Sequence, residues 1–401
     1  MMKFFVIIAL CFFITSINAQ KSVSAYVLDA DTKKSIDLVT VSSSTGYTIT
    51  NSDGGFIIKV REDDEIVLSH VSYQTTHIDF KQLSDTIFLK TKVNVLPDIF
   101  IMPRASIIKE LKAVWERYNN LLGRKREKDF PKQTFYYRQL TQYNDLYTEY
   151  IECFFEAPVS THVMTMTMLE GRYAGIKKDS LATIMNYFSL SQLPPFSRNR
   201  ALRYDAVNGF LVRDFERYYD IQLIRIISED TDDEVRVYEF TPNKIMINNS
   251  TTMLSGLLYI RKKDSSIISQ EINTKRMNLT GVPNVVDELY NFTVTYRDGL
   301  EPYPVVETVR CDAEISHMIS GKKNTIKLYS VLFAADYKLE IEGVKMKQND
   351  YLFQKVAESK YNQEFWDNNP IIKRTKIEQQ VLDDFNRLGY FGSIDLRQYN
   401  D

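Results

Sequence analysis

The sequence is poor in the residues that most often carry out chemistry. Its 401 residues include only three Cys and four His, and its 50 Lys and Arg nearly balance 52 Asp and Glu. So few Cys exclude a disulfide-dense scaffold. The formal net charge of −2 gives no basic footprint for nucleic acid. With 44% hydrophobic and 25% charged residues, the composition is that of a globular protein, and the length predicts two or three domains.

Motifs for hydrolytic and phosphate-binding sites are also missing. None of His70, His162 and His317 is followed three residues later by Glu, and there is no H-E-x-x-H, G-x-S-x-G or Walker-type motif. A nucleophile–base pair would need Cys153 or Cys311 beside His162 or His317, but no family signature surrounds either cysteine. The sequence therefore predicts no catalytic residue, no cofactor and no metal site.

Acidic residues leave two alternatives open. Asp29, Asp31 and Asp53 lie in turns and could supply calcium ligands, but they lack the regular spacing of a calcium loop, so turn capping is the preferred interpretation. The acidic runs at 62–65 and 229–234 are expected to be solvated loops. Paired carboxylates of a glycosidase are set by distance in space. A hydrolase is thus the third functional interpretation.

The first 19 residues have the pattern of a secretory signal peptide. Lys3 precedes an apolar run of 11 residues, Phe4–Ile14, and the small residue Ala19 follows a short polar stretch. The run is far shorter than the roughly 20 residues that span a bilayer. We expect cleavage after Ala19, export to a periplasmic or outer-membrane-associated location, and no transmembrane segment in the mature chain.

Export places the two remaining cysteines, Cys153 and Cys311, in an oxidising compartment. They could form one disulfide, but their spacing does not show whether they meet. Two buried thiols are the preferred interpretation.

Residues 21–102 have the pattern of a β-sandwich. Val23, Ala25 and Val27 alternate with polar residues, as in a half-buried strand, and the cluster at 51–55 (Asn-Ser-Asp-Gly-Gly) predicts a tight turn. Six further short strands are predicted at Leu38–Ser42, Tyr47–Thr50, Phe56–Val60, Glu65–Val71, Thr75–Phe80 and Thr86–Leu89.

The order of motifs in this region resembles the carboxypeptidase regulatory-like domain. The motifs are the turn within Val27–Ile36, the strand Val39–Val41, the hairpin Thr50–Phe56 and the stretch Ile66–Gln74, in which Ser72 replaces the usual Gly before Tyr73. The resemblance implies a non-catalytic, transthyretin-like sandwich of seven strands. Such domains occur at the N-terminus of many secreted and outer-membrane proteins of Gram-negative bacteria.

Residues 103–401 are predicted to form a larger antiparallel sheet or half-barrel flanked by helices. A 3.6-residue spacing from Ile107 to Leu122 predicts an amphipathic helix with Ser106 as N-cap and Gly123 as its stop. The strands expected are Asp98–Met102, Phe135–Arg138, Tyr147–Phe155, Val235–Phe240, Leu254–Arg261, Ile267–Ile272, Asp287–Tyr296, Val305–Ile315 and Thr325–Phe333, with a possible helix at Leu181–Leu190.

A second helix is predicted near the end of the chain. Thr375 and Glu378 have the spacing of a capping box, and Gly389 stops the helix. The apolar face that should pack on the sheet comprises Ile377, Val381, Phe385 and Leu388.

This larger region also resembles known proteins. The sequences at 135–138, at 150–157 and at 364–369 are similar to those of envelope proteins in which a regulatory-like domain precedes an uncharacterised β-rich region. The hairpin that starts at Gly256 resembles the half-barrel of lipoprotein carriers. The sequence thus predicts a non-enzymatic cell-envelope protein that binds an envelope protein, lipid or glycan and no nucleic acid. The alternative is a carrier or sensor of a hydrophobic ligand.

Overall fold

The computed structural model describes residues 20–92, 94–95, 102–123, 132–158, 166–176, 214–249, 253–275, 284–297, 305–335, 339, 341–346, 352–369 and 371–391. The chain divides into two compact units. Unit 1 holds Met1–His70, Gln74–Lys90 and Ile371–Lys373, and unit 2 holds Val71–Tyr73, Thr91–Pro370 and Arg374–Asp401.

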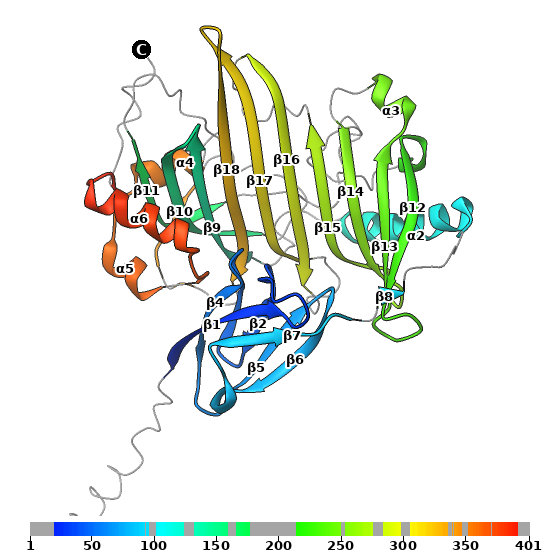
Figure 1. The fold of residues 1–401 in the computed structure, drawn as a ribbon, viewed down its shortest axis with the longest axis horizontal. Coiled ribbons are helices and arrows are strands. Elements are labelled where there is room, and N and C mark those ends of the chain that lie inside the picture. The colour runs from blue at the N-terminus through cyan, green and yellow to red at the C-terminus, as the bar shows by residue number, and fades with distance from the viewer. Residues whose placement is uncertain are drawn as a thin grey trace, which may run out of the picture. The chain divides into compact units, whose positions relative to one another are not determined.

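Unit 1 is built from two small sheets, as predicted. One sheet has the order β4-β1-β7 and the other β3-β2-β5-β6 (Figure 1). The strands are β1 (Lys21–Asp29), β2 (Thr40–Ser43), β3 (Gly46–Ile49), β4 (Gly55–Val60), β5 (Glu65–His70), β6 (Tyr73–Asp79) and β7 (Thr86–Leu89), with a short 3₁₀ turn η1 (Phe80–Gln82). Ala25 and Val27 are buried, so the predicted alternation along β1 is confirmed.

Unit 2 is organised around one antiparallel sheet of 12 strands. Its order is β19-β11-β10-β9-β18-β17-β16-β15-β14-β13-β12-β8 (Figure 1). The bounds are β8 (Asn94–Val95), β9 (Lys132–Tyr143), β10 (Leu146–Pro158), β11 (Thr167–Gly175), β12 (Tyr219–Ile227), β13 (Val235–Pro242), β14 (Met253–Arg261), β15 (Ser266–Lys275), β16 (Val285–Arg297), β17 (Val305–Ile319), β18 (Lys322–Ala335) and β19 (Val344–Lys345).

The predicted mainly β architecture with flanking helices is therefore confirmed. The strands from β12 to β18 form a meander, and the earlier hairpin of β9 and β10 adds to it through β9, which pairs with β18. The helices are α2 (Arg104–Gly123), α3 (Lys244–Asn249), α4 (Leu352–Glu358), α5 (Gln363–Asn368) and α6 (Lys376–Arg387), with a 3₁₀ turn η6 (Phe215–Arg217).

One face of this sheet, which we call the inner face, carries the main apolar core. Ile107, Leu111 and Val114 of α2 are buried in this core, as predicted, together with Val356 of α4. The predicted N-cap of α2 is wrong. The carbonyl of Pro103 accepts hydrogen bonds from the backbone N–H groups of Ser106 (2.8 Å) and Ile107 (3.2 Å), so Ser106 lies inside the first turn.

The opposite, outer face carries α6 at the β9–β11 end of the sheet. Val381, Leu382 and Phe385 of α6 form a buried cluster with Leu140, Tyr150 and Ala174. The capping box and the stop at Gly389 (φ +67°) are confirmed. The apolar face predicted for α6 is wrong at its two ends, because Ile377 is 57% exposed and Leu388 is 50% exposed. Leu382, which was not predicted, is buried instead.

Several predicted segments lie outside the described residues: the signal peptide at 1–19, most of the strand at 98–102 and the helix at 181–190. Within the described ranges, no helix is both long enough and apolar enough to cross a bilayer.

Candidate functional site

Cys153 and Cys311 are buried and free on the inner face. Cys153 is on β10 and Cys311 on β17, and β9 and β18 lie between these strands. Three inter-strand steps separate the cysteines by about 14 Å, whereas a disulfide requires Cα atoms within about 7 Å. The preferred interpretation, two buried thiols, is therefore confirmed. Burial raises the pKa of both thiols, which keeps them protonated.

The described structure does not bring a cysteine and a histidine together. His317 and Cys311 are six residues apart on β17, a separation of about 20 Å in a strand. His317 is buried, and its ring packs edge-on against Tyr143 at 5.9 Å. His162 lies outside the described residues.

The turn acid Asp29 of unit 1 bonds to the backbone and side chain of its own turn. The Asp29 carboxylate accepts hydrogen bonds from the backbone N–H groups of Asp31 (3.0 Å) and Thr32 (2.6 Å) and from the Thr32 hydroxyl (2.9 Å). These bonds are those of turn capping. Among the residues that the structure describes, no group of three or more His, Cys, Asp or Glu could hold a metal ion.

Two acids of the predicted solvated loops are in fact buried. Asp64 accepts a bond from the Arg61 backbone N–H (2.7 Å), and Glu234 pairs with Lys262 (2.7 Å) and Arg236 (3.1 Å). The hydrogen bond to Asp64 and the ion pairs of Glu234 offset the free-energy cost of burying these two carboxylates.

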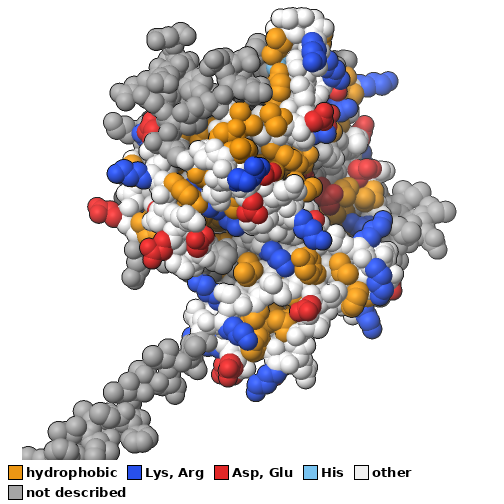
Figure 2. All heavy atoms as spheres, turned by 60° about the vertical axis from the view of Figure 1, so that its left-hand side comes forward, with side chains coloured by type: hydrophobic (Ala, Val, Ile, Leu, Met, Phe, Trp, Pro, Cys, Tyr) orange, Lys and Arg blue, Asp and Glu red, His pale blue; other side chains and the backbone are white. Residues whose placement is uncertain are grey.

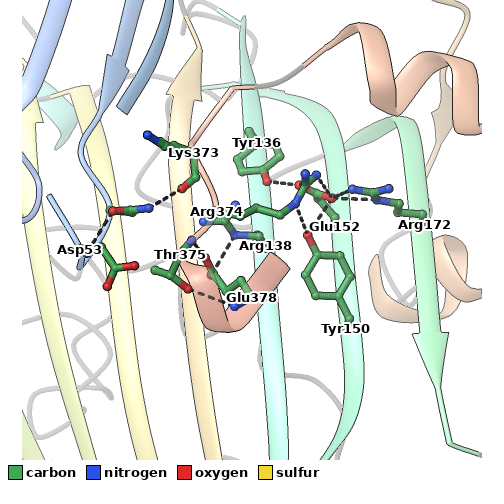
Figure 3. Close-up of polar contacts among 11 residues, drawn as sticks. Asp53, Tyr136, Arg138, Tyr150, Glu152, Arg172, Lys373, Arg374, Thr375 and Glu378 are labelled. Carbon is green, nitrogen blue, oxygen red and sulfur yellow. Dashed lines mark hydrogen bonds and ion pairs between the residues drawn. The ribbon is translucent and has the colours of Figure 1, made fainter. Parts of the chain in front are cut away.

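Several polar side chains of unit 2 surround Glu152 on the outer face. We call Glu152, Tyr136, Tyr150, Arg172 and Arg374 the Glu152 cluster (Figure 3). The strand register explains four members: Glu152 of β10 lies opposite Arg172 of β11, and Tyr136 and Tyr150 point to the same face because strand residues alternate. Arg374 comes from the segment just before α6.

The Glu152 carboxylate is surrounded by donors. Arg172 donates from Nε (2.7 Å) and from Nη2, the Tyr150 hydroxyl donates at 2.9 Å, and Arg374 Nη2 lies 3.4 and 3.5 Å from the two carboxylate oxygens. The Tyr136 hydroxyl donates to the remaining oxygen. The Glu152 side chain is only 2% exposed, so Glu152 is a buried anion with hydrogen bonds to both of its carboxylate oxygens.

This environment fixes the charge of the cluster. Burial alone would favour the neutral acid, but Arg374, Arg172 and Arg138 outweigh it and hold the pKa of Glu152 well below its ordinary value. Burial raises the pKa of Tyr136. A general acid or base works best with a pKa near the operating pH, so a permanently ionised carboxylate suits structure better than proton transfer.

The cluster also anchors the C-terminal helices on the sheet. The Arg172 guanidinium lies 4.6 Å from the ring centroid of Trp366 in α5. Arg138 of β9 forms an ion pair with Glu378 of α6 at 3.2 Å. Both helices are therefore tied to the outer face by arginines that project from the sheet.

The three residues that precede Arg374 are packed as part of unit 1. The Thr48 hydroxyl donates to the Ile371 carbonyl (2.6 Å), and the Asn51 amide donates to the Lys373 carbonyl (2.8 Å; Figure 3). Lys373 Nζ lies 3.9 Å from the centroid of the Tyr26 ring. A segment more than 300 residues away in sequence thus completes unit 1.

The sequence analysis predicted no site at the Glu152 cluster, although Tyr136, Tyr150 and Glu152 lie in the stretches 135–138 and 150–157 that carry the resemblance to envelope proteins. A signal was present, because Glu152 interrupts the otherwise apolar stretch Ile151–Phe155 of a strand that is buried on both faces. A charge at such a position needs a partner. Nothing in the local sequence identified that partner as Arg172 or Arg374.

Comparison with known proteins adds little. No protein-family model matches the chain, and no curated protein matches it. A structure of the Pseudomonas aeruginosa MucA/MucB complex is 10% identical, covers 54% of this chain and 93% of its own, and has a TM-score of 0.16. A crystal structure of MucB in complex with MucA(peri) is 7% identical, covers 57% and 94%, and has a TM-score of 0.15. Similarity at this level carries no argument about fold or function.

Proposed function

We propose that the chain is an exported, non-enzymatic binding protein of the cell envelope, with a regulatory-like sandwich joined to a large β-sheet unit. The observation that carries the proposal is that both oxygens of the Glu152 carboxylate are buried and bonded within the protein. Its buried carboxylate is engaged by two arginines and two tyrosines, which stabilises the fold around α5 and α6. Such an arrangement supplies a rigid scaffold rather than a reactive group.

The surface charge fits a protein, lipid or glycan partner better than nucleic acid. Lys and Arg side chains are interspersed with Asp and Glu on the face shown in Figure 2, without a broad patch of one sign. The net charge of −2 gives no overall attraction to a polyanion.

The first experiment tests the cellular location of the protein and its binding partner together. The full chain would be expressed with a C-terminal tag in a Gram-negative host, cross-linked in cells and recovered from the envelope fraction. We expect a mature protein that begins at Gln20 and a specific cross-linked partner. The matched control is the chain from residue 20 onward, which stays in the cytoplasm and reports non-specific capture. An unprocessed cytoplasmic chain, or identical cross-links in both samples, would refute the proposal.

The alternative, a carrier or sensor of a hydrophobic ligand, is favoured by one observation. Apolar side chains continue across the inner face from Phe135 of β9 to Phe292 of β16 and Leu258 of β14. Native mass spectrometry and lipid extraction of the exported protein test this function. A stoichiometric lipid would support it, and a protein free of lipid that also binds no added long-chain probe would refute it.

A further inference from the structure

Large apolar side chains are exposed at the end of the large sheet where the β9–β10 and β17–β18 hairpins turn. Because neighbouring strands are antiparallel, the start of β10, the end of β17 and the start of β16 all lie at this end (Figure 1). Leu146 of β10 is 46% exposed, Ile319 of β17 43% and Val286 of β16 58%. The short helix α3, which follows β13 at the same end, exposes Ile245 and Ile247. Single exposed apolar residues are normal, but several at one end of a sheet indicate an interaction surface.

The β17–β18 hairpin projects beyond its neighbours at this end. We call Met318–Lys323 the hairpin tip. Ile319 lies two residues beyond His317, the last residue of β17 with a register partner in β16. Lys322 lies four residues beyond Ile326, where the pairing of β18 with β9 ends. At about 3.4 Å per residue, the tip extends roughly 7 Å past the first ladder and roughly 14 Å past the second.

The turn of the hairpin tip is tight. Ile319 pairs with Lys322, so only Ser320 and Gly321 connect the two strands. Both connecting residues have positive φ, 48° at Ser320 and 77° at Gly321. Positive φ at both central positions is the geometry that matches the twist of two antiparallel strands, and glycine adopts it without strain. The tip therefore presents its side chains in a defined arrangement.

Each face of the hairpin tip carries an apolar side chain beside a lysine. Ile319 is opposite Lys322, and Met318 is opposite Lys323. Since residues of a strand alternate between its faces, the two pairs point in opposite directions. Both lysines are exposed, and neither forms an ion pair with a residue that the structure describes. Two positive charges are thus available at the tip.

The exposed acids on the strands beside the tip are set back from it. Asp287 of β16 is opposite Ser316, three residues before Ile319 and roughly 10 Å back along the strand. Asp145 lies in the β9–β10 turn, past which the tip projects. Ten ångströms is about the distance over which physiological salt screens a charge. The tip is therefore locally cationic, although the whole chain has a net charge of −2.

We propose that the hairpin tip docks on the anionic surface of a lipid bilayer, where Met318 and Ile319 enter the interface and Lys322 and Lys323 bind headgroup phosphates. Apolar side chains combined with cations are the composition of segments that bind membrane surfaces. A bilayer interface can surround a projecting hairpin, so it accommodates apolar side chains on both faces, whereas a rigid protein surface contacts one face. The inference rests on the proposed export only for which membrane the protein meets.

Co-sedimentation of the full mature chain with vesicles tests the charge contribution. We expect binding to vesicles of phosphatidylethanolamine and phosphatidylglycerol in equal parts, weakened by salt, and little binding to phosphatidylcholine alone. The double variant Lys322→Gln, Lys323→Gln should lower the partition coefficient by about 25-fold, because each lysine near an anionic surface contributes roughly fivefold. The matched control is Lys33→Gln, Lys34→Gln. It removes the same charge from two adjacent exposed lysines of unit 1 and should bind as the wild type does.

The apolar contribution is tested on the same anionic vesicles. Ile319→Ser should lower the partition coefficient by about tenfold, because the variant loses the transfer of an aliphatic side chain out of water. The matched control is Ile377→Ser on α6, which alters an exposed isoleucine away from the hairpin tip and should leave binding unchanged.

A site-specific probe shows which part of the chain meets the membrane. An environment-sensitive fluorophore on Ser320→Cys should shift to shorter wavelength with anionic vesicles. The same fluorophore on Ser265→Cys should not, because that residue has a similar φ of 56° but lies in the β14–β15 turn at the opposite end of the sheet. Cys153 and Cys311 are buried, so the label should react at the introduced cysteine.

The possible results separate this inference from the proposed function. Failure to bind anionic vesicles, or equal fluorescence shifts at positions 320 and 265, would overturn it. A cross-linked protein that is lost in Lys322→Gln, Lys323→Gln, without vesicle binding by the wild type, would assign the tip to a protein partner. That result would overturn membrane docking and leave the proposed binding role intact. Vesicle binding that depends on the tip would support docking even if no protein partner were recovered.

Discussion

The buried charge of Glu152 makes a strong prediction about the stability of unit 2. Glu152→Gln keeps the size of the side chain and an oxygen acceptor, but it removes the negative charge between Arg172 and Arg374. Each arginine would then be left without its carboxylate. We expect the variant to fold and to be clearly less stable at neutral pH.

The magnitude follows from the burial of the two arginines. Removing one partner of a buried ion pair costs about 3–5 kcal/mol, because the remaining charge is left desolvated. The Arg172 side chain is only 3% exposed and carries most of this cost, whereas Arg374 is 22% exposed and can regain water. We therefore expect a loss of about 3 kcal/mol in the free energy of unfolding, a large share of the roughly 5–15 kcal/mol of a typical domain.

Urea unfolding is a suitable assay, because Trp366 lies against Arg172 and its fluorescence reports on this region. The matched control is the double variant Glu152→Met, Arg172→Met. It replaces the pair by apolar side chains of similar volume and should be more stable than Glu152→Gln.

The pH dependence gives a second readout. Glu152 has a lowered pKa, so its stabilising effect is present above its ordinary value of 4.5 and is lost as the pH falls further. Wild type and Glu152→Gln should therefore converge in acid. A difference below about 1 kcal/mol at pH 7 would refute the view that Glu152 is the centre of a buried ion network.

Three smaller perturbations have distinct expected results. Arg374→Met should cost about 1–2 kcal/mol, less than Glu152→Gln because its contacts are longer and partly solvated, and faster hydrogen exchange in α6 would show it. Thr375→Ala should destabilise α6 by about 1 kcal/mol through loss of its N-cap, whereas Thr375→Ser should not, as thermal unfolding would reveal. Cys153 and Cys311 should resist a thiol reagent in the folded protein and both react in denaturant. A non-reduced mass that shows a disulfide would contradict this.

Local patterns were sufficient where local interactions decide the structure. The alternation at Val23, Ala25 and Val27 identified β1, and the spacing of Thr375 and Glu378 identified the start of α6. At Ser106 the same reasoning failed, since Pro103 had already begun the helix with its carbonyl. On α6 it failed at the ends of the apolar face, since a 3.6-residue pattern does not fix how a helix is rotated against its sheet.

Contacts between distant segments could not be predicted in this way. The pairing of β9 with β18 joins residues nearly 200 positions apart, and the bonds of Ile371 and Lys373 to unit 1 span more than 300. Alternation predicts which side chains share a face of a strand, but it does not identify the neighbouring strand. The Glu152 cluster depends on such information, because its members come from three strands and a distant segment.

The contrast between Glu149 and Glu152 shows what the register adds to the sequence. Both are glutamates of β10, three residues apart, and the pleat places them on opposite faces. Glu152 faces arginines and stays ionised, whereas desolvation beside an apolar core raises the pKa of Glu149 to about 7, against the hydrogen bonds from Tyr173 and Thr141, which lower it. Both contact β11, Glu152 through Arg172 and Glu149 through Tyr173. Glu152→Gln should therefore weaken the hold of Arg172 on β10, and hydrogen exchange of Arg172–Gly175 in β11 should be faster at neutral pH than in the wild type.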